Sequence, residues 1–432
     1  MRRKKVGTIT LALGLIVFGL GLFFNNFTNI QMTEIYKYWP VLLIGVGLEM
    51  FIYVLIYRRD EEVKLKLDGL CIVLIIAAAL FANNLSGVGD IGKLINYPMN
   101  MISGNITIDG IKYKDQLKET IVKEQVSKDF DINKLSVKNS FGDIKLLPSS
   151  DKTIKVEATV TIRYNDEKAA REYLQNVVKI SEGSDTQIYT QEYNGINRQN
   201  YSKATVDFVV YVPKDVYAEV DNSFGDIQVQ EIGKGADITN QHGDIKVKDI
   251  GGEAIIKNSF GNIDVQNIGG NLQADNQHGD IDAASIAGSA DVETGFGDLD
   301  VQDVGGKLTA KNNYGRITAK EIKGDADIKT SFGDIDAANI NGNTVINDNN
   351  GSIQVQELLG NVQIRNSFGD IQYSSSNTDN ADIYAKTSFG DVDTSLPLSV
   401  TKSINEQTAQ GKTGSGSYRI ELITNNGSIE IK

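Results

Sequence analysis

Aspartates spaced eighteen residues apart are the side chains of this chain best suited to binding a cation. Each follows directly after a repeating glycine, and the column consists of Asp226, Asp244, Asp280, Asp298, Asp334 and Asp370. Like charges on neighbouring strands repel, so either a bound cation or local hydrogen bonding must offset them. The Gly-Gly-x-Gly-x-Asp pattern of calcium-binding rolls is absent, and Asn262, Arg316 and Ser352 interrupt the column. Because turn aspartates accept backbone N–H bonds, we expect local hydrogen bonding, with Asp226, Asp244, Asp280 and Asp298 as the candidates for a cation-binding ladder.

The two histidines of the chain, His242 and His278, each stand directly before a repeating glycine. Most other repeats hold Phe or Tyr at this position, so the histidines belong to an aromatic column. A metal site needs clustered ligands and supporting groups around them. Two coils at the strand spacing of ~4.8 Å would separate the two rings by about 10 Å. We therefore expect a ladder of rings and neither a metal nor another cofactor.

Pairs of carboxylates are abundant in this sequence, so no single pair stands out as a candidate catalytic pair. Retaining glycosidases need two carboxyl groups at a fixed separation in a cleft, and a regular repeat offers no unique cleft. The sequence therefore predicts no catalytic residues and a protein that is not an enzyme. Parallel β-helices also host polysaccharide lyases, so a polysaccharide-active enzyme remains a remote alternative.

A repeat of eighteen residues positions these columns. Its glycine keeps one register at Gly225, Gly243, Gly261, Gly279, Gly297, Gly315, Gly333, Gly351 and Gly369. Aliphatic residues follow two and seven positions later, and a second glycine usually stands nine positions later, so each repeat has two halves that each open with a turn. Apolar residues two apart indicate β-strands. One such unit cannot bury its apolar face alone. We predict an all-β fold, a single-chain β-solenoid with one coil per repeat.

Two further patterns bear on this stack. Asparagine recurs three residues before the glycine, as in Asn222 and Asn240, and predicts a column of amides that satisfy one another. Copies of the same turn at 139–144, 387–392 and 424–429 indicate that the stack extends beyond the regular block at both ends.

Three apolar segments near the N-terminus, at about 6–24, 38–57 and 69–85, are each long enough to span a bilayer as a helix. Basic residues concentrate before the first segment and between the second and third, whereas the loop at 25–37 holds one Lys. This asymmetry predicts a cytoplasmic N-terminus and a solenoid outside the bacterial cell membrane. A missed fourth span would invert the location of the solenoid.

The chain therefore divides into five predicted regions. Residues 1–85 are a membrane domain and 86–128 a stalk or linker. Residues 129–220 are a strand-rich cap with strands at 153–164 and 205–212 and a helix at about 166–179, which we expect to cover one end of the solenoid. Residues 221–372 form the regular β-solenoid, and 373–432 form irregular terminal coils and a C-terminal cap.

The net charge indicates which ligands the exported part can bind, and the cysteine content indicates whether disulfides can support it. The net charge is −13, and the acidic excess lies after the predicted membrane domain. Such a surface repels nucleic acid and attracts cationic ligands, although acidity also keeps a repetitive β protein soluble. The only cysteine, Cys71, lies in the third predicted span, so no disulfide within one chain supports the exported part.

Two stretches resemble known families. The segment from Val206 to Pro213, followed by the repeating Asn-Ser-Phe-Gly-Asp-Ile turns, resembles a bacterial adhesin-like domain family of unknown function over about 130–432. The glycine-bearing first span and the stretch from Trp39 to Gly47 resemble the membrane region of LiaF-type envelope-stress proteins over about 1–85. The resemblances imply a β-solenoid-like, non-enzymatic protein of the cell envelope and supply no catalytic residues.

Two functions remain open from the sequence. The first is an envelope-stress sensor or regulator whose acidic rod meets a cationic peptide or a partner protein. The second is a structural or adhesive surface protein whose repetitive face binds wall polymer or another cell. The membrane resemblance favours the first function and the length of the repeat favours the second.

Overall fold

The computed structural model describes residues 2–6, 63–67, 107–108, 111–125, 132–150, 153–191 and 200–432. These belong to two compact units, Met1–Gly104 and Asn105–Lys432. In the first unit, β1 (Arg2–Val6) pairs in parallel with β2 (Val63–Leu67). Among the described residues, no helix is long and apolar enough to cross a membrane. Apart from Val6, which ends β1, the three predicted spans lie outside the described residues and stay a prediction.

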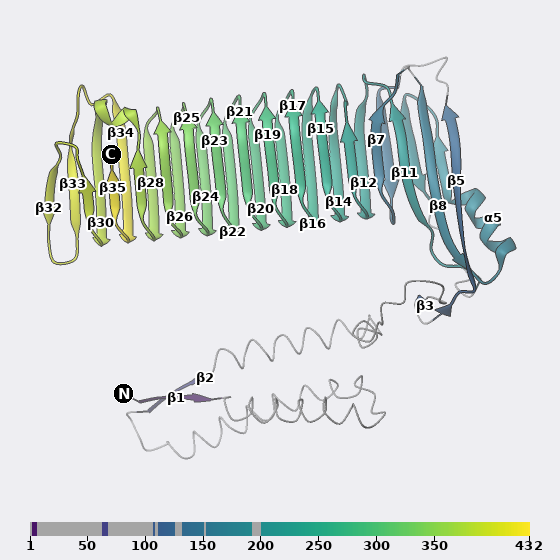
Figure 1. Cartoon of the computed structure of the whole chain (residues 1–432), viewed down its shortest axis with the longest axis horizontal. Coiled ribbons are helices and arrows are strands. Elements are labelled where there is room, and N and C mark those ends of the chain that lie inside the picture. The colour runs from purple at the N-terminus through teal and green to yellow at the C-terminus, as the bar shows by residue number, and fades with distance from the viewer. Residues whose placement is uncertain are drawn as a thin grey trace. The chain divides into compact units, whose positions relative to one another are not determined.

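The second unit is a rod of stacked coils, as Figure 1 shows. Its strands form a 16-stranded and a 15-stranded sheet, and every regular coil adds one strand to each. In the 16-stranded sheet the regular strands are β12 (Tyr217–Phe224), β14 (Gly235–His242), β16 (Glu253–Phe260), β18 (Leu272–His278), β20 (Ala290–Phe296), β22 (Leu308–Tyr314), β24 (Ala326–Phe332), β26 (Thr344–Asn350) and β28 (Val362–Phe368). In the 15-stranded sheet they are β13 (Ile227–Gln230), β15 (Ile245–Ile250), β17 (Ile263–Ile268), β19 (Ile281–Ile286), β21 (Leu299–Val304), β23 (Ile317–Ile322), β25 (Ile335–Ile340), β27 (Ile353–Leu358) and β29 (Ile371–Ser374).

Neighbouring coils pair in parallel with an offset of one repeat, so that Ile245 lies beside Ile263 and Ile263 beside Ile281. The prediction of a β-solenoid with eighteen-residue coils is confirmed.

The core is one column of aliphatic side chains between the two sheets. Along β19, Ile281, Ala283 and Ile286 are buried, whereas Asp282 between them points outward and is exposed. Each fully buried large aliphatic side chain stabilises the fold by about 1.5–3 kcal/mol. The alternation holds from coil to coil, so the stack shares one continuous interior.

At the N-terminal end the coils are not stacked in chain order. The coil of β6 (Lys134–Asn139) and β7 (Ile144–Pro148) lies directly beside β12 and β13, and the later strands β10 (Asp185–Thr190) and β11 (Thr205–Val212) stack outside it. Beyond them lie β8 (Ile154–Tyr164), β9 (Val178–Ser181) and β5 (Asp115–Gln125). A short hairpin of β3 (Thr107–Ile108) and β4 (Ile111–Lys112) precedes β5.

The helix of this end is α5 (Glu167–Val177), which lies at the end of the rod in Figure 1 and packs on β8 and β9. Asp166 caps it by accepting a hydrogen bond from the backbone N–H of Ala169 at 3.2 Å. The predicted helix over 166–179 is slightly too long at its C-terminal end, because Val178 and Lys179 already belong to β9.

The predicted stalk over 86–128 is wrong for residues 115–125. They form β5, which pairs antiparallel with β8 along its whole length. Charged residues precede and follow Leu117 and Ile121 in this strand, and the side chains of Leu117 and Ile121 pack against the core. That charge content resembles a linker, but it suits an edge strand because charges discourage further pairing.

The C-terminal end has the same out-of-order arrangement. The last coil of the chain, β34 (Tyr418–Asn426) and β35 (Ile429–Ile431), lies between the coil of β28 and β29 and the coil of β30 (Ala381–Phe389) and β31 (Val392–Thr394). A 3-10 helix, η2 (Ser376–Asn380), leads into β30, and the hairpin of β32 (Ser399–Lys402) and β33 (Gln407–Lys412) ends the 16-stranded sheet. The expected extension of the stack at both ends is confirmed.

Candidate functional site

Each regular coil turns twice. The first corner joins a strand of the 16-stranded sheet to the next strand of the 15-stranded sheet and contains the aromatic residue, the repeating glycine and the following aspartate. The second corner joins the 15-stranded sheet back to the 16-stranded sheet. Both columns of residues that the sequence singled out therefore lie at the first corner.

Glycine is required at the first corner for two reasons. From Gly225 to Gly333 the repeating glycines have φ between +121° and +155°, which other residues rarely adopt. A Cβ atom at Gly279 would also lie 2.2 Å from the carbonyl oxygen of Gly261. The corners of successive coils are thus in backbone contact, which brings the flanking side chains of neighbouring coils into register.

The aromatic residues of the first corner form a continuous stack, as the sequence predicted. Ring centroids of neighbouring coils are 4.6–5.1 Å apart and the rings are nearly parallel. The stack consists of Phe141, Phe224, His242, Phe260, His278, Phe296, Tyr314 and Phe332. We call this row the aromatic ridge. Both histidines lie between two phenylalanine rings.

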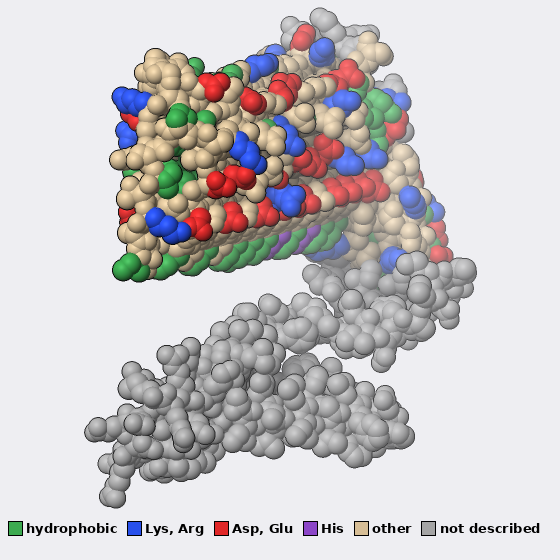
Figure 2. All heavy atoms as spheres, turned by 60° about the vertical axis from the view of Figure 1, so that its left-hand side comes forward, with side chains coloured by type: hydrophobic (Ala, Val, Ile, Leu, Met, Phe, Trp, Pro, Cys, Tyr) green, Lys and Arg blue, Asp and Glu red, His purple; other side chains and the backbone are tan. Residues whose placement is uncertain are grey.

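The aromatic ridge is exposed to solvent. Its five Phe and Tyr members from Phe224 to Phe332 are 42–49% exposed, and Figure 2 shows them as a row of green side chains with the purple histidines among them. The rings cover one another's faces, so their edges point to solvent. At the N-terminal end of the row, Lys203 lies over the outer face of Phe141, with its Nζ 5.3 Å from the ring centroid.

The aspartate column lies on the 15-stranded-sheet flank of the ridge. The Oδ1 atom of Asp226 accepts a hydrogen bond from the backbone N–H of Asp244 at 2.9 Å, and Asp280 accepts one from Asp298 at 2.8 Å. Asn262 replaces an aspartate and accepts the same bond from Asp280 at 3.0 Å. Each side chain therefore caps the turn of the next coil, not its own turn. The cation-binding ladder stays a prediction.

A second acidic column adds to this flank. Asp264, Asp282 and Asp300 lie beside one another on adjacent strands, two residues after the first column. Partial burial raises the pKa of Asp282, and the nearby carboxylates of Asp300, Asp264 and Asp280 raise it further. In Figure 2 a row of acidic side chains follows the ridge. This flank has a negative potential that favours cations.

On the opposite flank, the column next to the ridge is uncharged, and the next outward-facing column contains both signs of charge, such as Lys257, Asp275 and Lys311. The residues two positions before the repeating glycine, on the 16-stranded-sheet side, are Ser223, Gln241, Ser259, Gln277, Gly295, Asn313, Ser331, Asn349 and Ser367. The first corner is thus asymmetric, with an apolar ridge, carboxylates on one side and neutral polar groups on the other.

The buried asparagine column behind the ridge differs from the prediction. Its amides do not bond to one another; each donates to the glycine carbonyl of the preceding coil, as from Asn240 Nδ2 to Gly225 O at 3.0 Å. The reason is geometric, because that carbonyl faces the amide across the corner. The side-chain oxygens of Asn222, Asn240, Asn258 and Asn276 have no hydrogen-bond partner.

Asp348 occupies this donor column, although a carboxylate cannot donate. It is 4% exposed; its Oδ1 accepts from the backbone N–H of Asn350 at 3.1 Å, and its Oδ2 has no partner. Burial raises the pKa of Asp348 to about 6. Only the protonated form of Asp348 has a donor at the position where asparagine donates in other coils.

The second corner contains a feature that the sequence analysis missed. Eight non-glycine residues, one per coil, have φ between 50° and 60°, and they are Glu231, Asp249, Asn267, Ser285, Asp303, Glu321, Asn339 and Glu357. In the sequence these eight residues have only two properties in common: each is polar, and each stands six residues after the repeating glycine. Some bond along the column, as Asn267 Nδ2 does to Asp249 Oδ1 at 2.7 Å.

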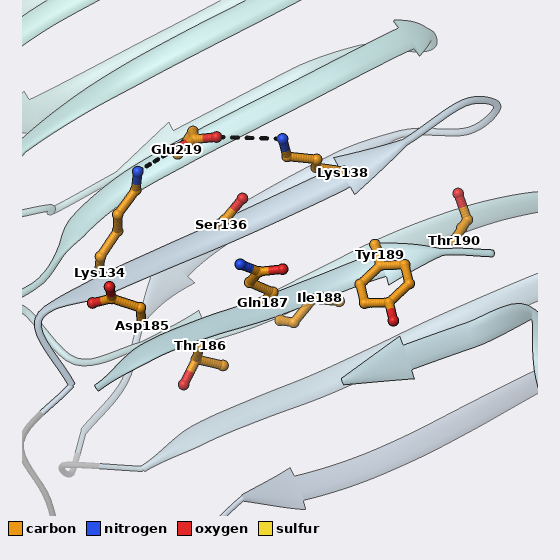
Figure 3. A pocket seen from close by; sticks show the side chains of 10 residues that line it. All are labelled: Lys134, Ser136, Lys138, Asp185, Thr186, Gln187, Ile188, Tyr189, Thr190 and Glu219. Carbon is orange, nitrogen blue, oxygen red and sulfur yellow. Dashed lines mark ion pairs between the residues drawn. The ribbon is translucent and has the colours of Figure 1, made fainter. Parts of the chain in front are cut away.

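A polar hollow of about 550 Å³ lies on the outer face of the 16-stranded sheet near its N-terminal end (Figure 3). Lys134 and Lys138 both pair with Glu219 there, the latter at 3.6 Å. The hydrogen bond from Lys134 lowers the pKa of Glu219. These charges neutralise one another, so the hollow offers less to a ligand than the first corner does.

The fold and the two corners define a repetitive β-solenoid rod, and comparison with family models gives its family. Residues 132–338 and 323–432 match the Toastrack DUF4097 model, and the chain belongs to this family. Residues 9–51 match the model of the LiaI-LiaF-like transmembrane region. Both resemblances found in the sequence are confirmed. The chain joins a membrane-associated N-terminal region to a Toastrack domain, as in a protein of the cell envelope.

Solved structures with low similarity were also found. A candidate cell adhesion protein from Clostridium sporogenes is 12% identical, with a TM-score of 0.16, and covers 73% of this chain and 99% of its own. A candidate lipid-binding protein from Parabacteroides distasonis is 14% identical, with a TM-score of 0.25, over 72% and 96%. A candidate adhesin from Bacteroides fragilis is 13% identical, with a TM-score of 0.20, over 73% and 97%. Nothing about function follows from similarity at this level. No curated protein matches the chain.

Proposed function

We propose that this protein is a non-enzymatic envelope-stress sensor or regulator, anchored in the bacterial cell membrane, whose acidic rod binds a partner or a cationic ligand outside the cytoplasm. The observation that carries the proposal is the combination of two parts in one chain. One is the match of residues 9–51 to a LiaI-LiaF-like transmembrane region. The other is a rod whose first corner presents an exposed ridge beside two acidic columns.

The orientation of the rod is supported by charge. The basic residues of β1 and of β2 lie on paired strands, which fits a chain that crosses the membrane an even number of times between them. Positive charge favours the cytoplasmic side. A third span at 69–85 then leads the chain out of the cytoplasm.

A structural or adhesive surface role is the second candidate, and the size of the rod favours it. Sixteen strands at ~4.8 Å make a rod of about 70 Å. Deletion of the gene separates the two roles: loss of a sensor alters the transcriptional response to wall-active compounds, whereas loss of an adhesin alters attachment. A polysaccharide-active enzyme remains the remote alternative.

Protease accessibility tests the proposed location. An external protease added to intact wall-stripped cells should remove the rod, detected with a tag after Lys432, while a cytoplasmic marker stays whole. Protection of the tag until the membrane is permeabilised would place the rod in the cytoplasm and overturn the proposal.

A further inference from the structure

The aromatic ridge exposes more apolar surface than the fold requires. Turning the chain at the first corner depends on glycine and on backbone contact. Asn350 occupies the ring position in one coil, and the corner still forms there, because the backbone N–H of Gly333 donates to Asn350 O at 3.0 Å and Asn350 lies beside Phe368. Contiguous apolar patches on soluble domains are typical of binding surfaces, and aromatic residues are enriched at them. The ridge therefore needs a partner to explain its exposed rings.

The geometry of the stack restricts what that partner is. Cation–π binding requires a cation over the face of a ring. Here the faces are covered by neighbouring rings at 4.6–5.1 Å, and the outer face of Phe141 is covered by Lys203. Between the two ends of the row, a ligand can meet only ring edges, in a straight line. Seven steps from Phe141 to Phe332 make this row about 34 Å long.

Charge restricts the partner further. Carboxylates follow one flank of the ridge in two columns, whereas the nearest column of the other flank is uncharged and the next one mixes acidic and basic residues. A second copy of the rod would bring like charges together, and anionic lipid headgroups would be repelled. The complementary ligand has a narrow apolar stripe with cations along it.

We propose that the aromatic ridge and its acidic flank bind a cationic amphipathic helix that lies along the rod. At 1.5 Å per residue, a helix of about 22 residues matches the row of rings. Its apolar stripe contacts the ring edges, and its Lys or Arg side chains pair with the aspartates of the flank. The inference rests on the proposed function for its biological role, but the binding chemistry requires only the rod.

Binding is measured with the full-length protein in nanodiscs of zwitterionic lipid, with empty nanodiscs as the blank. The probe is a labelled 22-residue peptide of Leu and Lys with all Leu on one helical face, and its scrambled sequence is the peptide control. We expect saturable binding of the amphipathic peptide that weakens with salt, and binding of the scrambled peptide at least about tenfold weaker.

Three paired substitutions locate the site. Phe260→Ser with Phe296→Ser removes two rings and should weaken binding about tenfold or more. Asp280→Asn with Asp298→Asn should weaken it at least about threefold and flatten the salt dependence; Asn262 shows that asparagine preserves the corner hydrogen bond. Asp303→Asn with Glu321→Gln removes the same charge from the second corner and should change the affinity by less than about twofold.

Equal losses at both corners, or binding no greater than to empty nanodiscs, would overturn the inference. So would a dimer in sedimentation that the Phe260→Ser and Phe296→Ser variant abolishes, because the ridge would then belong to a second copy. These results are independent of the protease test, since both faces of a nanodisc are open to the peptide and the binding assay does not depend on which side of the cell membrane holds the rod.

Discussion

Both corners of each coil turn the chain from one sheet to the other, but they use different residues in the positive-φ region to do so. The first corner uses glycine at φ above +120° and repeats an aromatic residue and an aspartate around it. The second corner places Glu, Asp, Asn or Ser, with no single residue type, in the left-handed region. It also repeats a glycine three residues later, as at Gly252, where a Cβ atom would meet the backbone of the preceding coil. Folding therefore explains the glycine of the first corner and the polar character of the second. Stacking between coils accounts for the faces of the repeated rings of the first corner, and we assign their exposed edges to binding.

The largest expected effect concerns the interior that both corners enclose. Ile281→Asp places an unpaired carboxylate in the core and should cost several kcal/mol, about 4 or more. Asp282→Ala, one residue away and exposed, should change the free energy of unfolding by about 0.5 kcal/mol or less. Denaturation of the two variants measures both values. Equal losses would contradict the alternation on which the two-corner description depends.

Substitution at the corners themselves compares them directly. Gly279→Ala forces a Cβ atom to within 2.2 Å of Gly261 O at φ +131° and should cost about 3 kcal/mol or more. Ser285→Gly, at φ 60° in the second corner of the same coil, should be neutral or stabilise by up to about 1 kcal/mol. Thermal unfolding of both variants checks this. A loss at Ser285→Gly as large as at Gly279→Ala would remove the distinction between the corners.

The buried column behind the first corner predicts a pH dependence. Because the folded pKa of Asp348 is raised to about 6 from 3.8, the unfolded chain releases this proton first, and the contribution of Asp348 to stability falls as the pH rises from about 4 to about 6. Asp348→Asn supplies a permanent donor and should raise the stability by about 2–3 kcal/mol at pH 7.5. Urea denaturation at pH 4.5 and pH 7.5 measures the change, with Asp226→Asn, an exposed carboxylate far along the rod from Asp348, as the control. A gain of the same size at both pH values would refute the assignment.

The smallest expected effect is that of calcium. The carboxylates of the first corner already accept backbone hydrogen bonds, so chelator should not shift the melting temperature. A calcium site that forms only in the folded state would add about 2.7 kcal/mol at a hundredfold excess over Kd. A saturable rise in melting temperature that disappears in the Asp280→Asn and Asp298→Asn variant would show a metal-binding ladder instead.

Strict repetition made the coil, its interior and the aromatic stack predictable from the sequence. The glycine register fixes the coil length, and aliphatic residues in register fix the buried side, so Ile281 and Asp282 could be placed without a structure. The stack of His242 between Phe224 and Phe260 followed from the same register.

Three features could not be predicted, each for a physical reason. The turn copies at 139–144, 387–392 and 424–429 fit any coil, so the sequence did not show that β34 lies between β28 and β30. The left-handed residues of the second corner, such as Ser285 and Glu321, share no residue type that marks them. The partner of each buried asparagine depends on which group faces it across the corner, and that group is a glycine carbonyl.

Cysteine labelling in cells tests most directly whether the first corner is a binding surface outside the cytoplasm. In a Cys71→Ser background, Gln277→Cys marks the neutral flank of the ridge and Ser285→Cys marks the second corner of the same coil. The account predicts that a membrane-impermeant maleimide labels both in intact wall-stripped cells, and that the amphipathic peptide slows labelling at position 277 several-fold but not at 285. Labelling of either site only after permeabilisation, or equal slowing at both, would contradict it.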